Sequence, residues 1–377
     1  MNFEFSEEQE LLREQAQRFL RDQCPLTAVR AVLDDHTKTH DAKVWQGMVD
    51  LGWTAVSIPE QYGGLGLGYL ELCVIAEELG RSLAPTPYAS SVYLATEALL
   101  QFGSEAQKER YLPQLAAGDL VATFAMAEGR GQTNPDSLDT VFEQGLLRGD
   151  KLPVPDGDVA NLCVVLASDN DTAGGAATLF LVDLEAAGVE REGLRNLDPS
   201  RSQARISFQG VAAETLGEAG SGWAHTQRLF DRAAVLYAFE QTGGAQAAMD
   251  MAREYAMGRY AFGRSIASFQ AIKHKLADMY IANTLARSNC YYGAWALSVD
   301  SPELPLAAAT ARLTAHRAFT ECSAENIQTH GGMGYTWEYD CHLYYRRAKS
   351  MGVNLGSISS WEDRLVTALE MNVVKEA

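Results

Sequence analysis

The sequence lacks long apolar runs, a signal-like N-terminus and an excess of basic residues. None of its apolar runs approaches the roughly 20 residues of a membrane-spanning helix, so we expect no membrane segment. The N-terminus MNFEFSEEQE is acidic and has no apolar core, which argues against a secretory signal. Lysine and arginine number 31 against 49 aspartates and glutamates, and the formal net charge of -18 disfavours nucleic acid and anionic membranes as partners.

Cysteine is also scarce, and its spacing argues against the usual thiol sites. No two of the six cysteines are closer in sequence than Cys322 and Cys341. Zinc-binding and redox motifs place two cysteines only a few residues apart. We therefore expect reduced, buried thiols, no bound metal and a cytoplasmic location.

The glycine-rich run GGLGLG at 63–68 lacks the spacing of a dinucleotide-binding loop. A G-x-G-x-x-G pattern that starts at Gly64 and Gly66 would need its third glycine at Tyr69. The preceding residues IPEQY do not have a strand pattern either. We interpret this run as a mobile loop or tight turn.

The hydrophobic periodicity changes twice along the chain, near residues 119 and 218. The first part is helical, and its first helix has a capping box made by Ser6 and Gln9. The segments LVATFAMA, NLCVVLAS and AATLFLVDL then follow one another with no helical pattern between them, which predicts a small antiparallel barrel or sandwich. The last part has long helical stretches at about 222–258, 268–299, 304–331 and 358–374, which predict an antiparallel four-helix bundle.

These changes predict an α+β fold with several domains. A chain of 377 residues is longer than one hydrophobic core usually serves. We expect an N-terminal helical domain at 1–118, a middle antiparallel β-barrel at 119–218 and a C-terminal four-helix bundle at 219–377.

Two C-terminal stretches resemble the signatures of acyl-CoA dehydrogenases. They are RYAFGRSIASFQAIKHKLADMY at 259–280 and QTHGGMGYTWEYDCHLYYRRAKS at 328–350. The stretches GWTAVSIPEQYGGLGLG and KERYLPQLAAGD resemble the N-terminal domain of the same family, so the resemblance covers nearly the whole chain. It implies an FAD cofactor, an acyl-CoA substrate and a homo-oligomer, either a dimer or a tetramer.

The resemblance also assigns cofactor contacts. Arg259 would reach the FAD pyrophosphate, for which its guanidinium is a permanent, forked cation. Phe262 would pack on the cofactor and Gln270 would bond its adenosine half. The second signature would act on the cofactor of the neighbouring subunit, where glycines let the backbone approach closely. Its residues are Gln328, Gly331 and Gly332.

The middle domain departs from the family pattern at both of its flavin contacts. The usual Thr-Glu-Pro is replaced by MAEGRGQTNPDS, so Met126 falls at a contact position and only Glu128 is kept. The usual Trp-Ile-Thr-Asn is replaced within KLPVPDGDVAN. Pro155 therefore stands where a threonine hydroxyl normally meets flavin N5, and it can offer only its carbonyl.

The base that removes the substrate α-proton is missing from its usual positions. Most members of the family carry it in a Tyr-Glu-Gly-Thr stretch, whose matching residues here are Asn-Leu-Gly-Ser with Leu355 at the glutamate position. A second known position, on the first helix of the bundle, matches Ala233. Glu362 lies about two helical turns beyond Leu355, which is too far away.

Glu240 is the one charge between Arg232 and Asp250, in an otherwise apolar helical stretch. It lies on the same helix face as Ala233, about 10 Å deeper. A subset of the family that includes enzymes for steroid side chains resembles this arrangement, so we predict Glu240 as the general base. A structural acid paired with Arg228, with Arg232 or with an arginine on another helix is the alternative, and surface exposure is a further one.

The sequence therefore predicts FAD-dependent oxidation of an acyl-CoA thioester to a trans-2-enoyl-CoA, with electrons passed to an electron-transfer flavoprotein. The alternative is a non-catalytic subunit of a heterotetrameric acyl-CoA dehydrogenase that completes a partner's FAD site. The missing glutamate favours this alternative, whereas the presence of both signatures in one chain favours a homo-oligomer. A third interpretation is oxidation by O₂. Leu355 in place of the glutamate favours a bulky, branched or ring-bearing acyl group.

Overall fold

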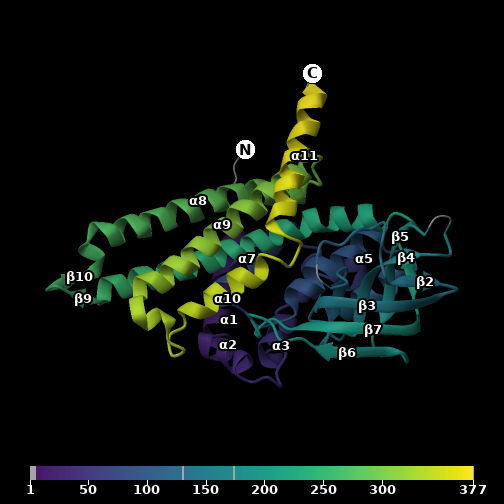
Figure 1. Ribbon diagram of the computed structural model, residues 1–377, viewed down its shortest axis with the longest axis horizontal. Helices are drawn as coiled ribbons and strands as arrows, with labels where there is room; N and C mark the ends of the chain where they lie inside the picture. The colour runs from purple at the N-terminus through teal and green to yellow at the C-terminus, as the bar shows by residue number, and fades with distance from the viewer. Residues whose placement is uncertain (1–5, 130, 173–174, 377) are drawn as a thin grey trace. The chain divides into compact units, whose positions relative to one another are not determined.

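The computed structural model describes residues 6–129, 131–172 and 175–376 (Figure 1). The described residues form two compact units, and helix α7 (Gly222–Gly258) passes from one unit to the other. The three sequence domains at 1–118, 119–218 and 219–377 remain a prediction. The first unit contains the chain up to Val29, Tyr69–Ala84 and Ala234 onward, and the second contains Arg30–Gly68 and Pro85–Ala233.

The first unit is helical. The four long helices predicted after residue 218 are present, and a shorter helix, α10, is added to them. The predicted capping box is also confirmed, because Ser6 Oγ accepts the Gln9 N–H at 3.3 Å and Gln9 Oε1 accepts the Ser6 N–H at 2.9 Å. The other elements are α1 (Glu7–Gln23), α4 (Tyr69–Ser82), β9 (Tyr260–Ala261), β10 (Arg264–Ser265), η4 (Ile266–Ser268), α8 (Gln270–Ser298), α9 (Leu304–His330), η5 (Gly331–Tyr335), α10 (Cys341–Met351) and α11 (Ile358–Glu376).

Helices α4 and α7 cross with their backbones in contact. A Cβ atom on Gly80 would lie 1.8 Å from the carbonyl oxygen of Glu240, and one on Gly243 would lie 1.8 Å from that of Glu77. No residue with a side chain fits at either position without displacing a backbone, because real Cβ atoms do not approach so closely. The crossing therefore places Glu240 in the middle of the packed helices.

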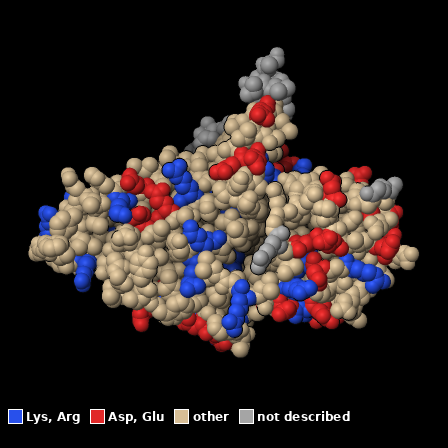
Figure 2. Space-filling model, in the orientation of Figure 1, with Lys and Arg blue, Asp and Glu red and all other residues tan. Residues whose placement is uncertain are grey.

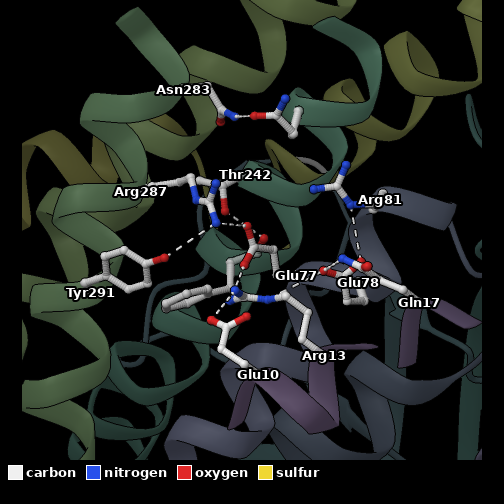
Figure 3. Close-up of polar contacts among 12 residues, drawn as sticks. Glu10, Arg13, Gln17, Glu77, Glu78, Arg81, Thr242, Asn283, Arg287 and Tyr291 are labelled. Carbon is white, nitrogen blue, oxygen red and sulfur yellow. Dashed lines mark hydrogen bonds and ion pairs between the residues drawn. The ribbon is translucent and has the colours of Figure 1, made fainter. Parts of the chain in front are cut away.

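A cluster of ion pairs around two buried carboxylates, Glu77 and Glu78, lies beside this crossing (Figure 3). Glu77 of α4 accepts contacts from Arg13 of α1 at 3.2 Å and from Arg287 of α8 at 3.1 Å. Glu78 Oε2 lies 3.2 Å from Arg81 Nε. Burial raises the pKa of Glu78, and the Arg81 guanidinium opposes this effect. The arginines compensate the buried carboxylates, since unpaired charges inside a protein are costly.

The second unit combines short helices with a sheet. The π-helical segment η3 precedes α5 without a break and packs against strand β1. Its helical segments are α2 (Leu26–Leu33), which begins in the first unit, α3 (Ala42–Asp50), η1 (Trp53–Ala55), η2 (Glu60–Tyr62), η3 (Ala89–Thr96), α5 (Glu97–Phe102) and α6 (Glu105–Ala116). Its strands are β1 (Ala122–Ala125), β2 (Val141–Glu143), β3 (Leu146–Pro155), β4 (Leu162–Asp169), β5 (Ala177–Asp183), β6 (Val189–Gly193), β7 (Gln203–Ala212) and β8 (Glu214–Leu216).

The expected closed antiparallel barrel is wrong, because the sheet is open. Its strand order is β6-β7-β3-β2-β4-β5-β8, with β1 paired to β4 beside this path. Within the described residues, β6 pairs only with β7 and β8 only with β5, so no ladder joins the two ends. The β1–β4 and β2–β4 pairs are parallel, which also differs from the expectation. Strand β6 carries Glu190, Arg191 and Glu192, and charged, exposed residues are typical of an edge strand.

Surface charge and the cysteines agree with the composition. Acidic and basic side chains are interspersed on the face shown in Figure 2. All six cysteines are free and buried. Among the described residues, none of the helices combines the length and the apolar character needed to cross a bilayer.

Candidate functional site

The first signature begins where α7 ends and forms the β9–β10 hairpin. Arg259 is exposed, and its backbone carbonyl accepts the Ile266 N–H at 2.8 Å. Its guanidinium forms no ion pair or side-chain hydrogen bond with any described residue, so its charge is available to an anion. Phe262 lies at the hairpin turn, with a φ of 53° and 94% of its surface exposed. A ring that the chain itself leaves uncovered is suited to packing on a cofactor.

The second signature lies at the same end of the α8–α9 hairpin as the first. Gln270 is the first residue of α8, and Gln328 lies in the last turn of α9. An ion pair between Lys275 and Glu325 joins these two helix ends. Both predicted glutamines are exposed. The structure therefore brings the two signatures together from positions far apart in the sequence.

The two glycines after α9 face open space. Gly331 has a φ of 62°, which favours glycine, and apart from the chain neighbours no described residue has a heavy atom within 4 Å of a Cβ built on Gly331 or Gly332. Packing within this chain therefore does not explain the glycine at position 332. The open space beside its backbone is available to a ligand or to a second subunit. An available guanidinium, an exposed ring and this open backbone together fit FAD.

The predicted flavin contacts of the second unit lie on β3 and just after β1. Met126 and Pro155 are both partly buried. Ala127 O accepts the Leu152 N–H at 2.8 Å, and Leu152 O accepts the Gly129 N–H at 2.8 Å, so the two segments run side by side. Thr123 Oγ1 donates to Pro155 O at 2.5 Å. The one polar group that Pro155 could offer therefore already has a partner within the chain.

The sequence reasoning missed Lys151, which lies under the same segment. Its side chain is completely buried, and Nζ donates to Glu128 Oε1 at 2.7 Å and to Met126 O at 3.2 Å. Burial lowers the pKa of Lys151, while Glu128 opposes the effect. Burial also acts to raise the pKa of Glu128, but the Lys151 ammonium and the hydrogen bonds to the carboxylate outweigh it, so that this pKa is lowered. The sequence did contain a signal for this pair. Lys151 is the one lysine in the stretch that forms β3, and Glu128 is the one residue kept from the Thr-Glu-Pro pattern.

Asp156 follows Pro155 and is another buried acid that the sequence reasoning missed. It is 4% exposed, has a φ of 51°, and accepts the Ser90 hydroxyl at 2.6 Å. Burial raises the pKa of Asp156 to about 6, although the charge of Arg201 and the hydrogen bond from Ser90 act in the opposite direction. The carboxyl therefore titrates within the range of ordinary buffers.

The structure places Glu240 inside the first unit, with 0% of its surface exposed. Its Oε1 lies 3.8 Å from Nη1 of Arg347 on α10. Arg232, in the second unit, bonds Glu97 at 2.5 Å. The role of Glu240 as the base remains a prediction. Its contacts favour the alternative of a structural acid paired with an arginine on another helix.

The other two base positions carry no carboxylate. Leu355 is 2% exposed, and its carbonyl accepts the Trp361 Nε1–H at 2.9 Å. Ala233 is fully buried. Glu362 is exposed on α11. Therefore none of the positions that the family resemblance indicates carries a solvent-accessible carboxylate.

Two protein-family models match the chain. The acyl-CoA dehydrogenase N-terminal domain matches residues 6–119, and the C-terminal domain matches residues 220–359. The probable acyl-CoA dehydrogenase YngJ of Bacillus subtilis is 30% identical over 98% of this chain and 100% of its own length. The chain belongs to the acyl-CoA dehydrogenase family. Its relatives are oxidoreductases, and the flavoproteins among the matching structures imply FAD as the cofactor.

Solved structures of the family match almost the whole chain. Butyryl-CoA dehydrogenase from Megasphaera elsdenii is 26% identical with a TM-score of 0.90, covering 98% of this chain and 100% of that one. A chain of the ChsE4-ChsE5 complex from Mycobacterium tuberculosis is 27% identical with a TM-score of 0.87, covering 98% of this chain and 99% of that one. The acyl-CoA dehydrogenase described here thus has relatives both among enzymes and in a complex of two chains.

Proposed function

We propose that this acyl-CoA dehydrogenase oxidises an acyl-CoA thioester to a trans-2-enoyl-CoA and passes the electrons to an electron-transfer flavoprotein. The observation that carries the proposal is the meeting of both signatures at one end of the α8–α9 hairpin. Because the two signatures meet, Arg259, Phe262, Gly331 and Gly332 would contact one FAD that is bound across the boundary with a neighbouring subunit. FAD, when bound, accepts a hydride from the substrate.

Exposed apolar side chains support the sharing of this end with a second subunit. Single exposed apolar residues are ordinary, but a group of large ones marks a binding surface. Around the hairpin and the second signature they include Met257, Tyr260, Phe262, Met333, Tyr335 and Trp337.

A non-catalytic subunit of a heterotetramer is a second candidate, and one observation favours it. Glu240 is buried beside Arg347, and Leu355 and Ala233 cannot accept a proton. In such an assembly a related chain supplies the base, and this chain completes the FAD site. The match to a chain of the two-chain ChsE4-ChsE5 complex supports this candidate.

The experiment is an absorbance spectrum of the purified chain followed by anaerobic addition of acyl-CoA thioesters, straight, branched and ring-bearing. Bound flavin that bleaches with one of them supports a self-sufficient dehydrogenase. Bleaching only after a related chain is mixed in supports the heteromeric subunit. A chain that never retains flavin, alone or mixed, contradicts both candidates. Addition of an electron-transfer flavoprotein or of O₂ to the bleached enzyme then identifies the electron acceptor.

A further inference from the structure

Lys151 is a fully buried cation in strand β3, where its Cα is paired with Ile206 of β7. A charged group in the interior costs free energy unless it is paired. An apolar side chain of similar length would fill the same space without that cost. We therefore look for the reason for a lysine at this position in the groups to which its ammonium is hydrogen-bonded.

The ammonium connects three parts of the chain. It donates to Met126 O, just after β1, and to Glu128 Oε1, two residues further on. The Glu128 carboxylate in turn accepts the N–H groups of Asp139 and Thr140, each at 2.8 Å, just before β2. A single buried cation therefore fixes both ends of the connection from β1 to β2.

The backbone completes the attachment from the other side. Leu152, the residue after Lys151, exchanges hydrogen bonds with Ala127 and Gly129, both at 2.8 Å. The segment Met126–Gly129 is thereby held on β3 by its main chain and by the lysine. Without the ammonium, Met126 O would lose its donor, and the charge of Glu128 would lose its partner.

We propose that Lys151 is a positioning residue for the cofactor, which holds the Met126–Gly129 segment in the conformation that contacts the flavin. This inference rests on the proposed function, because the flavin contacts of Met126 and Pro155 are themselves predictions. Lys151 acts through Met126 O and Glu128 and touches neither the cofactor nor the substrate.

The test compares Lys151→Met with Arg232→Met in the full chain. Both changes remove a buried cation from an ion pair in the second unit, since Arg232 bonds Glu97. Three quantities are measured: the melting temperature, the amide hydrogen exchange of the flavin-free protein, and the dissociation constant of FAD. We expect Lys151→Met to accelerate exchange at Gly129 and Leu152 and to weaken FAD binding roughly 10- to 100-fold. Arg232→Met should lower the melting temperature and leave both other quantities at the parent values.

An FAD dissociation constant for Lys151→Met equal to the parent value would overturn the proposal and leave Lys151 a stabilising residue only. If Lys151→Met does not fold, Glu128→Gln tests the same contacts from the partly exposed side. It should weaken FAD several-fold, and an unchanged constant again overturns the proposal. If the parent chain binds no FAD, alone or with a related subunit, the proposed function is contradicted as well. The FAD dissociation constant of the parent therefore distinguishes failure of the proposed function from failure of the Lys151 proposal.

Discussion

Arg347 Nη1 lies 3.8 Å from Glu240 Oε1, and each of the two side chains is 1% exposed. Arg347 also donates to Leu83 O at 3.2 Å, so α10 is tied to the segment that follows α4. A carboxylate and a guanidinium buried together constrain each other, because removal of either leaves a charge in the interior. The pair therefore bears on both stability and the assignment of the base.

Replacement of Glu240 by Gln should lower the stability of the protein. The buried Arg347 would lose the negative charge of Glu240 beside it, and breaking such a pair costs about 3 kcal/mol in the free energy of unfolding. The double variant Glu240→Gln with Arg347→Met removes both charges and should recover much of the loss. Urea unfolding of the two variants and of the parent measures the effect.

The same variant separates the two roles of Glu240. A structural acid predicts that Glu240→Gln still allows flavin bleaching by the acyl-CoA that bleaches the parent. If the variant is as stable as the parent but its bleaching slows by about 10²-fold or more, Glu240 is the base after all.

Replacement of Arg259 by Ala should release FAD, since it removes a guanidinium that has no partner among the described residues. Arg253→Ala is the matched control, because Arg253 is 56% exposed in the same last part of α7 and, among the described residues, forms an ion pair only with its helix neighbour Asp250. The ratio of flavin to protein absorbance measures the loss. Full flavin content in Arg259→Ala would contradict the pyrophosphate contact.

Asp156 should make the stability of the protein depend on pH. Its folded-state pKa of about 6 is above the ordinary 3.8, so folding favours the protonated carboxyl. The contribution of this group is present below about pH 4 and is lost as the pH rises through 6. Asp156→Asn should therefore raise the free energy of unfolding by about 3 kcal/mol at pH 7 and by less than about 1 kcal/mol at pH 4.

Unfolding curves at both pH values test this prediction, with Asp119→Asn as the control. Asp119 is an exposed aspartate outside the contacts of Asp156. Equal effects of Asp156→Asn on the free energy of unfolding at pH 4 and pH 7 would show that ionisation of this carboxyl does not contribute to the pH dependence of stability.

Replacement of Gly243 by Ala should force α4 and α7 apart. The new Cβ would lie 1.8 Å from Glu77 O, a contact that only a backbone shift relieves. We expect a loss of about 3 kcal/mol or more. Gly258→Ala at the end of α7 is the control, because no described residue outside its own helix turn and chain neighbours lies within 4 Å of its Cβ. A melting temperature of Gly243→Ala equal to that of the control would contradict the crossing.

Local signals predicted much of the fold. The capping box of Ser6 and Gln9 formed as expected, because both partners lie within one helical turn. Strand β3 was missed, since its charged residues and two prolines hide the alternation of a strand. The prediction of a closed sheet was wrong. Closure depends on whether edge strands that are distant in the sequence pair with each other, and the residue pattern within each strand does not contain that information.

The sequence by itself determined the helices, the family and the cofactor, because these follow from short-range periodicity and from two contiguous signatures. Only the tertiary structure decided which side chains contact the acidic residues Glu240 and Glu128. Glu240 was recognised as unusual, but its partner Arg347 lies on another helix and is brought to it by packing. Lys151 and Glu128 are likewise joined only when β3 lies beside the segment after β1. The charge of a side chain is written in the sequence, whereas its partner and its burial are set by contacts between residues far apart along the chain.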